Sequence, residues 1–220
     1  MLIIVEQKPL EEIFEMLNPY NSVLVVGCDG CAAVTQSGGE KQAQVTASLI
    51  DMGSKIRKKS LNVKAVSVLR QCDRQIVATS LKPFIEDYEV ILAMGCGAGV
   101  QTIGNVFENK IVLPAHDTKF IGCHDREVGK FSELCKACGE CILDETGGIC
   151  PVTLCAKSLM NGPCGGNSKG KCEVGGWKKD CAWILIFNRL KNQGKLDLFT
   201  KFRPPRNYQL SQSPRELGGE

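Results

Sequence analysis

The stretch VLVVGC, Val23 to Cys28, is an unbroken run of apolar residues that ends in a glycine and a cysteine. Such a run is typical of a β-strand that is buried on both faces. Three later runs have the same character: NVKAVSVL (62–69), EVILAMGC (89–96) and KIVLPA (110–115). Stretches with helical character lie between them, at about 39–52, 75–88 and from 99 onward. Strands that alternate with helices predict an α/β fold with a parallel sheet and right-handed crossovers.

Cysteines recur near the ends of these predicted strands. They are Cys28, Cys72 and Cys96 after the first three strands, Cys31 in the loop after the first, and Cys123 beyond the fourth. The carboxyl ends of parallel strands share one edge of a sheet, where ligands bind, so we expect these thiols to gather on one rim. Strand ends also hold cysteines that have no function, so chance competes with a binding site here.

The composition of the chain changes after residue 125. Residues 126–195 are rich in glycine and cysteine, and their main helical stretch is CAWILIFNRLKNQ (181–193). A small irregular module cannot bury enough apolar surface by itself, so a metal or cluster must add stability. The sequence thus predicts a parallel-sheet α/β domain (1–125), a small irregular cysteine-rich cluster-binding module (126–195) and an extended polar tail (196–220).

Composition and the absence of targeting signals limit the function further. The 220 residues carry a net charge of only +3, which does not indicate a nucleic-acid partner. No apolar run approaches the roughly 20 residues that span a bilayer, and MLIIVEQKPLEE does not resemble a signal peptide. We therefore expect a cytoplasmic protein, in which an odd number of 13 cysteines indicates metal binding rather than disulfides. A single redox-active pair remains open.

The spacing of the eight downstream cysteines favours iron–sulfur clusters over zinc. Cys135, Cys138 and Cys141 form a triplet at three-residue intervals, as in bacterial ferredoxins, and one zinc site does not need such a triplet. Cys150 precedes a proline, as in ferredoxins, but after a longer gap. The other four cysteines are Cys155, Cys164, Cys172 and Cys181. Eight thiolates suit two [4Fe–4S] clusters, yet the spacing leaves open which cysteine serves which cluster.

Other motifs supply no equipment for substrate chemistry. The glycines of GCGAGVQTIG (95–104) do not match the dinucleotide-binding pattern. His116 and His124 are the only histidines, and neither has a partner nearby in sequence, so we expect structural roles for both. No Ser/His/Asp set, paired carboxylate site or phosphate-binding loop is visible. The sequence predicts no catalytic residues.

Several of these segments resemble a known family. LCKACGECILDETGGICPVTLCAKSLMNGPCGG (134–166), GKCEV (170–174) and DCAWILIFNRL (180–190) are similar to the cysteine-rich family found at the C-terminus of, or beside, methylenetetrahydrofolate reductases. VLVVGCDGCAAVTQSGGEKQ (23–42), ILAMGCGAGVQTIG (91–104) and VLPAHDTKFIG (112–122) resemble the preceding domain in the small iron–sulfur subunit of the acetogen-type reductase complex.

This resemblance implies a non-catalytic electron-transfer subunit. Its partner would be a separate flavin-containing subunit that reduces 5,10-methylenetetrahydrofolate to 5-methyltetrahydrofolate, and an upstream electron donor is implied but not identified. The resemblance makes the eight downstream cysteines ligands of two [4Fe–4S] clusters. It also places Cys28, Cys31 and Cys96 in matching motifs, whereas Cys72 and Cys123 join a third cluster site only through the rim argument.

Two other interpretations stay open. The chain could be a zinc-stabilised scaffold or interaction subunit of the same complex without redox activity, because cysteine-only zinc sites are common. The rim cysteines could instead bind a small metabolite or a corrinoid partner.

Overall fold

A computed structural model describes residues 2–218, and the chain folds as two compact units. The first unit runs to Phe120 and includes His124–Phe131, while the second comprises Ile121–Cys123 and the chain from Ser132 onward. Each unit is described by itself below.

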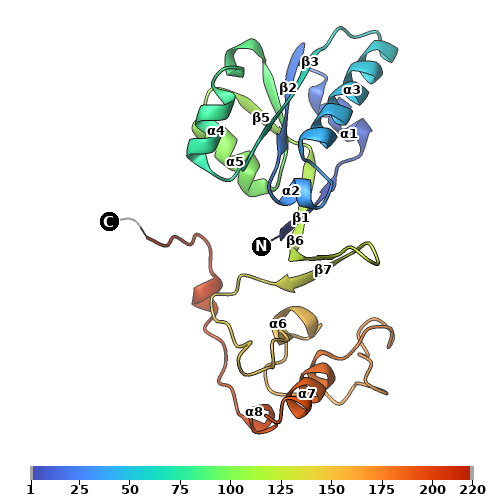
Figure 1. Cartoon of the computed structure of the whole chain (residues 1–220), viewed down its shortest axis with the longest axis vertical. Coiled ribbons are helices and arrows are strands. Elements are labelled where there is room, and N and C mark those ends of the chain that lie inside the picture. The colour runs from blue at the N-terminus through green and yellow to red at the C-terminus, as the bar shows by residue number, and fades with distance from the viewer. Residues whose placement is uncertain (1, 219–220) are drawn as a thin grey trace. The chain divides into compact units, whose positions relative to one another are not determined.

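A parallel four-stranded sheet forms the centre of the first unit (Figure 1). Its strands are β2 (Ser22–Cys28), β3 (Asn62–Val68), β4 (Val90–Met94) and β5 (Ile111–Pro114), in the order β3-β2-β4-β5. Val25 of β2 lies opposite Ala65 of β3 on one side and Leu92 of β4 on the other. The predicted α/β fold with a parallel sheet is confirmed.

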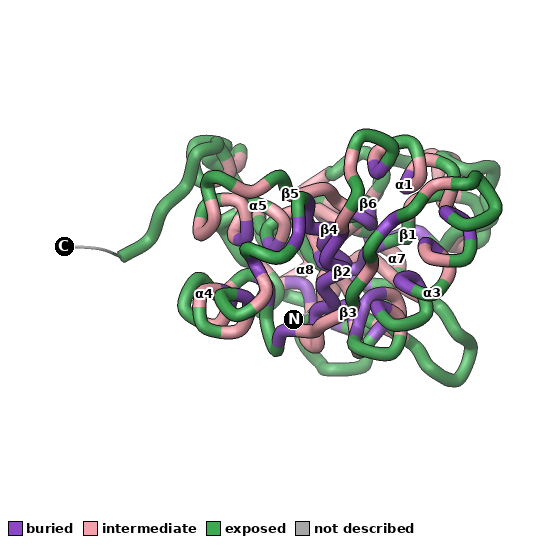
Figure 2. Tube along the Cα trace, turned by 90° about the horizontal axis from the view of Figure 1, so that it is seen from above, coloured by how far each residue is buried: buried purple, intermediate pink, exposed green. Residues whose placement is uncertain are grey.

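Helices cover both faces of this sheet, which explains why its central strands are continuously apolar. Val23 and Val25 pack with α1 (Leu10–Leu17) and α3 (Glu40–Ile56), whereas Leu24 and Val26 pack with α4 (Arg74–Leu81) and α5 (Gly97–Val106). Figure 2 shows the buried residues gathered along β2 and β4. Successive side chains of a strand point to opposite faces, so each face needs its own apolar set.

The helical stretch predicted at 75–88 divides into α4 and a 3₁₀ helix, η1 (Ile85–Asp87). Asp73 begins α4, and its carboxylate accepts hydrogen bonds from the backbone N–H groups of Gln75 and Ile76, both at 3.0 Å. This is the usual way in which an aspartate satisfies the first free N–H groups of a helix.

Three strands lie outside the pattern that we predicted. They are β1 (Leu2–Gln7), β6 (His116–Asp125) and β7 (Lys130–Cys135), which form a second sheet in the order β1-β6-β7. Much of β6 is exposed and polar, so no apolar run marks it in the sequence. A strand with one solvated face gives a weaker signal than a strand buried on both faces.

The second unit has a small apolar core beneath long irregular loops. Its helices are α6 (Pro151–Leu154), α7 (Ala182–Asn192), α8 (Asp197–Thr200) and the 3₁₀ helix η2 (Tyr208–Ser211). Trp183, Ile186 and Leu190 of α7 are fully buried, and Trp183 Nε1 donates a hydrogen bond to the carbonyl of Leu159 at 2.9 Å. A core this small leaves the surrounding loops with little stabilisation from apolar burial.

Arg203 anchors the beginning of the predicted tail to the rest of the second unit. This side chain is only 4% exposed, and its Nε donates to Glu145 Oε2 at 2.7 Å. The Arg203 backbone N–H and carbonyl also bond the side-chain amide of Asn161, each at 2.8 Å. The segment after residue 196 is therefore ordered by side-chain contacts as well as by the short helices α8 and η2. Among the described residues, no helix is long and apolar enough to cross a membrane.

Candidate functional site

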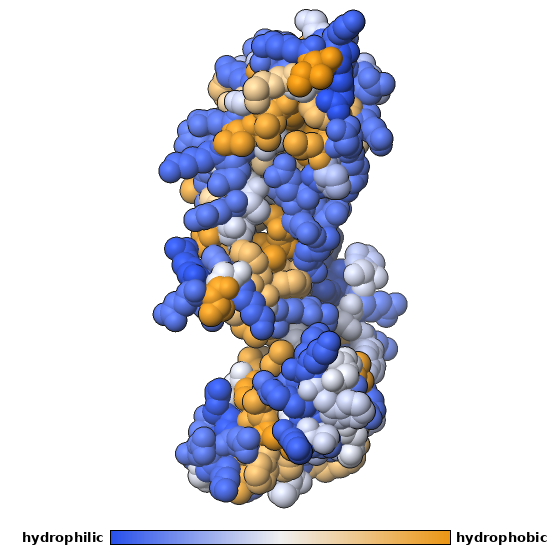
Figure 3. Space-filling view, turned by 90° about the vertical axis from the view of Figure 1, so that its right-hand side faces the viewer, coloured by the Kyte–Doolittle hydropathy of each residue, from blue (hydrophilic) through white to orange (hydrophobic). Residues whose placement is uncertain are grey.

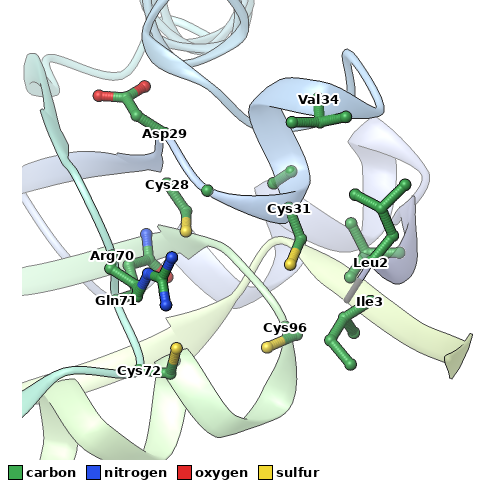
Figure 4. A pocket seen from close by; sticks show the side chains of 14 residues that line it. Leu2, Ile3, Cys28, Asp29, Cys31, Val34, Arg70, Gln71, Cys72 and Cys96 are labelled. Carbon is green, nitrogen blue, oxygen red and sulfur yellow. The ribbon is translucent and has the colours of Figure 1, made fainter.

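Four of the five rim cysteines come together in the first unit. Cys28 ends β2, Cys31 begins the short helix α2 (Cys31–Val34), Cys72 follows β3, and Cys96 immediately precedes α5. They line one cavity of about 440 Å³. Figure 4 shows their sulfur atoms directed toward the same space. Cys123 lies on β6, is exposed, and is not among the described residues that line this cavity.

Sheet topology explains the position of this cavity. The chain leaves β2 toward β3 on one side, and β4 lies on the other side of β2. The connections therefore diverge between the ends of β2 and β4, and such a divergence leaves a crevice at the carboxyl edge of a parallel sheet. Cys28 and Cys96 lie on the two sides of this crevice.

The thiols in this cavity affect one another electrostatically. Burial raises the pKa of the Cys72 thiol, and negative charge on Cys96 and Cys28 raises it further. Cys28 itself is buried against Val5 and Ala32. Gathering several thiolates in such a place is unfavourable unless a cation compensates their charge.

Gln71 closes the polar side of the cavity. Its side chain is 1% exposed, and Nε2 donates to the carbonyl of Val26 at 2.8 Å. Its Oε1 is buried and has no hydrogen-bond partner among the residues that the structure describes. A Cβ at Gly95 would lie 2.2 Å from this oxygen, so a larger residue before Cys96 would displace the buried Gln71 side chain.

In the second unit, the structure brings Cys155, Cys164, Cys172 and Cys181 to one small pocket. Its volume is about 20 Å³, and Trp183 forms part of its wall. Cys164 Sγ donates to Glu173 Oε1 at 3.6 Å, and Lys157 forms an ion pair with the same carboxylate. The hydrogen bond from Lys157 lowers the pKa of Glu173. A carboxylate and an ammonium group therefore accompany these four thiols.

The triplet and Cys150 are the four downstream cysteines that do not line this pocket. Thr153 Oγ1 donates to the carbonyl of Leu134 at 3.4 Å, which holds the residue before Cys135 against α6, the helix that Cys150 begins. Within the triplet, the Ala137 backbone N–H donates to Cys135 Sγ at 3.3 Å. N–H groups directed at cysteine sulfur are the contacts that tune iron–sulfur ligands.

The donor chemistry of the downstream cysteines fits iron–sulfur ligation. All eight are free thiols, and four of them line one pocket. The arrangement is not a finished ion site, because no group of three or more cysteine, histidine or acidic side chains within residues 2–218 is placed to hold a metal ion. Ligation would require the side chains to adjust.

Residues 113–209 match the family described as methylene-tetrahydrofolate reductase C terminal. This part of the chain is similar to that family. The matched family region contains the eight downstream cysteines, Cys123 and most of the segment that we predicted as a tail. The cavity that Cys28, Cys31, Cys72 and Cys96 line is formed by residues before the family region.

Two other comparisons add little. No curated protein matches the chain. One solved structure, an extracellular ligand-binding receptor from Verminephrobacter eiseniae EF01-2, is 10% identical with a TM-score of 0.33. The match covers 48% of this chain and 28% of the receptor, and a likeness this weak carries no argument.

The tail covers the triplet of the family region, which the sequence did not indicate. Arg206 Nη2 donates to the carbonyl of Cys138 at 3.3 Å, and Arg215 Nη1 donates to the carbonyl of Ala137 at 2.5 Å. Leu210 packs on Gly139, whose φ is +85°. A proline-rich polar segment gives no periodic signal from which such contacts could be predicted.

The two histidines lie in surroundings that suit structural roles. His116 is 4% exposed, burial lowers its pKa, and its Nε2 donates to the carbonyl of Ser37 at 2.9 Å. His124 stacks on Phe131 with ring centroids 4.4 Å apart.

Proposed function

We propose that this chain is the iron–sulfur electron-transfer subunit of a methylenetetrahydrofolate reductase complex. The family match associates the chain with such a complex. The observation that supports the finer proposal is that the family region holds eight free thiols, four of which line one pocket. In this function the chain receives electrons from a donor protein and delivers them to the flavin of a separate catalytic subunit.

The residues of this chain would hold two [4Fe–4S] clusters, one on each downstream set. The set of Cys135, Cys138, Cys141 and Cys150 has the ferredoxin-like triplet, and the other set is Cys155, Cys164, Cys172 and Cys181. When bound, such clusters supply one-electron redox chemistry. The thiols must lose their protons to ligate iron, and the N–H of Ala137 and the guanidinium of Arg206 favour negative charge around the triplet.

Exposed apolar side chains support a protein partner. Trp177, Phe202 and Tyr208 of the second unit are 54%, 78% and 69% exposed. On the face that Figure 3 shows, hydrophobic residues gather in patches among hydrophilic ones. Apolar patches with polar surroundings are common where a protein docks on another.

Metal and sulfide analysis of the anaerobically purified chain tests this proposal. We expect a brown protein whose broad absorbance decreases on reduction. Serine replacement of Cys138 and of Cys172 should each remove up to about four irons, because each belongs to a different four-iron cluster. Cys123→Ser is the matched control, since Cys123 is an exposed thiol outside both sets. An iron-free preparation would refute the proposal.

Delivery of electrons needs its own test. The reduced chain is mixed anaerobically with the flavin-containing subunit, and the flavin absorbance near its oxidised maximum is followed in a stopped-flow instrument. We expect the flavin to be reduced at a rate that depends on the chain's iron content. A flavin that stays oxidised in the presence of a fully reduced, cluster-loaded chain would contradict the electron-transfer role.

The pocket volume supports one alternative, a zinc-stabilised scaffold. The pocket at Cys155, Cys164, Cys172 and Cys181 measures about 20 Å³, close to the space for one small sphere. A structural zinc ion needs four thiolates and little else. One zinc per chain and no sulfide would favour this scaffold, and the same metal analysis therefore decides between the two functions.

A further inference from the structure

The cavity at the sheet edge is a candidate for a separate binding site. Four cysteines from three strand ends line it, and all of its lining residues precede the family region. Neither downstream set takes part in it. An inference about this cavity therefore does not depend on what the downstream cysteines bind.

The cavity has room for a group larger than one tetrahedral ion. Zinc–sulfur bonds of about 2.3 Å place four sulfurs about 3.8 Å from one another, and such a cluster of sulfurs encloses almost no free space. The four cysteines instead line about 440 Å³. A [4Fe–4S] cluster separates its four thiolates more widely, because each thiolate binds a different corner iron.

The lining chemistry suits a cluster better than an organic metabolite. Leu2, Ile3, Val5 and Val34 form an apolar wall beside the four thiols. Four cysteines around one space match the donor set of a [4Fe–4S] cluster, whereas a metabolite is usually oriented by a few dissimilar polar groups. Arg70, which also lines the cavity, provides positive charge that offsets the charge of a thiolate-bound cluster.

Helix α5 adds a second electrostatic contribution. Cys96 precedes the first residue of this ten-residue helix. The amino end of a helix carries partial positive charge, which stabilises a thiolate at that position. Gly99 lines the cavity, and a Cβ at this position would lie 2.7 Å from the Cβ of Gln71.

We propose that Cys28, Cys31, Cys72 and Cys96 ligate a third [4Fe–4S] cluster at the carboxyl edge of the parallel sheet. Cys123, which we predicted as a member of this rim site, takes no part. The Cys-x2-Cys pair contributes two ligands from the β2–α2 connection, and the β3–α4 and β4–α5 connections contribute one each.

The test compares variants of the full-length chain after anaerobic reconstitution with iron and sulfide. Cys72→Ser is the first variant, because Cys72 is exposed and its replacement should leave the fold intact. Cys123→Ser is its control, a second exposed thiol that does not line the cavity. A double variant, Cys28→Ser with Cys96→Ser, removes two ligands, and circular dichroism checks the fold of all three.

We expect about twelve irons in the unmodified chain and in the control, from three four-iron clusters. The double variant should lose about four irons and four sulfides, and Cys72→Ser should lose one to four irons with an altered EPR signal. Wild-type iron and EPR in a folded Cys72→Ser variant would overturn the proposal. So would one zinc ion, or an organic compound, released from the unmodified chain and lost from Cys72→Ser without any change in iron.

The same series distinguishes this proposal from the proposed function. Loss of iron from the cavity variants alone, with none lost from Cys138→Ser or Cys172→Ser, would retain the third cluster and refute the downstream clusters. The opposite pattern would retain the downstream clusters and refute the third.

Discussion

Arg206 donates a hydrogen bond from Nη2 to the backbone carbonyl of Cys138 at 3.3 Å, although the two residues are 68 positions apart in the chain. This contact places a guanidinium group beside the middle cysteine of the triplet. Nearby positive charge stabilises the reduced, more negative state of an iron–sulfur cluster and so raises its potential.

Replacing Arg206 by methionine should therefore lower the potential of the cluster that we propose on the triplet. We expect a decrease on the order of 20–60 mV, which corresponds to roughly 0.5–1.4 kcal/mol for one electron. EPR-monitored redox titration measures it. Arg206→Lys keeps the charge and should stay closer to the wild-type potential, and equal potentials in all three proteins would contradict the assigned influence of Arg206.

Gly139→Ala should loosen the tail from the triplet. The alanine would have to adopt a φ of +85°, and its Cβ would lie 2.8 Å from both Cβ and the carbonyl oxygen of Leu210. Gly148→Ala is the matched control, because its φ is +81° but its Cβ would meet nothing within 4 Å. We expect a loss of about 1 kcal/mol in the control, from backbone strain alone, and about 1–3 kcal/mol more at Gly139.

Thermal unfolding and limited proteolysis of the tail measure this difference. The Gly139 variant should be cleaved faster than the control within residues 205–215. Equal cleavage and equal stability would show that the contact between Gly139 and Leu210 does not hold the tail.

Arg203→Met should destabilise the second unit strongly. It leaves Glu145 without the buried partner at 2.7 Å, and breaking a buried pair in this way costs about 3–5 kcal/mol. Lys201→Met removes the more exposed partner of the same carboxylate and should cost less, about 1 kcal/mol or below. Denaturant unfolding followed by Trp fluorescence reports on the change, since Trp183 lies in this core. Equal losses in the two variants would contradict the role of burial.

The stabilising contribution of the Glu145 carboxylate should decrease at acidic pH. Hydrogen bonds from Lys201 and then Arg203 lower the pKa of Glu145 below its ordinary value of 4.5. A depressed carboxylate pKa contributes stability above the unfolded-state pKa and loses it as the pH falls through the folded-state pKa. We therefore compare the free energies of unfolding of the wild type and Glu145→Gln in denaturant titrations of the cluster-free chain. The wild type should have its full advantage at pH 6 and a smaller one below pH 4.5. An advantage that does not depend on pH would argue against this assignment.

His116 should make the first unit less stable at mildly acidic pH. Burial lowers its pKa from 6.5, so the folded state binds the proton less readily than the unfolded state does. The contribution of neutral His116 to the free energy of unfolding is fully present above about pH 6.5, and it decreases as the pH falls toward the folded-state pKa. Urea unfolding at pH 7.5 and pH 5.5 should show this decrease in the wild type and a smaller one in His116→Gln. The same pH dependence in both proteins would assign it to another group.

Apolar patterning was sufficient for the parallel sheet but not for the second sheet. Strands such as β2 are buried on both faces, so their continuous apolar runs stand out from the loops. The strand β6 exposes aspartate, threonine and lysine near its beginning, and its pattern does not differ enough from that of a loop. The tail contacts of Arg206 and Arg215 could not be predicted either, because polar side chains that bond backbone carbonyls follow no periodic pattern in the sequence.

The sequence alone determined the α/β fold, the presence of a cysteine-rich C-terminal region and the expectation that thiols follow the strand ends. These depend on local patterns of apolar residues and on the spacing of cysteines along the chain. Only the tertiary structure decided which thiols meet. It placed Cys28, Cys31, Cys72 and Cys96 around one cavity without Cys123, and it brought Cys155, Cys164, Cys172 and Cys181 together. Strand order and loop paths decide which cysteines lie close together, and neither can be read from the spacing of residues along the sequence.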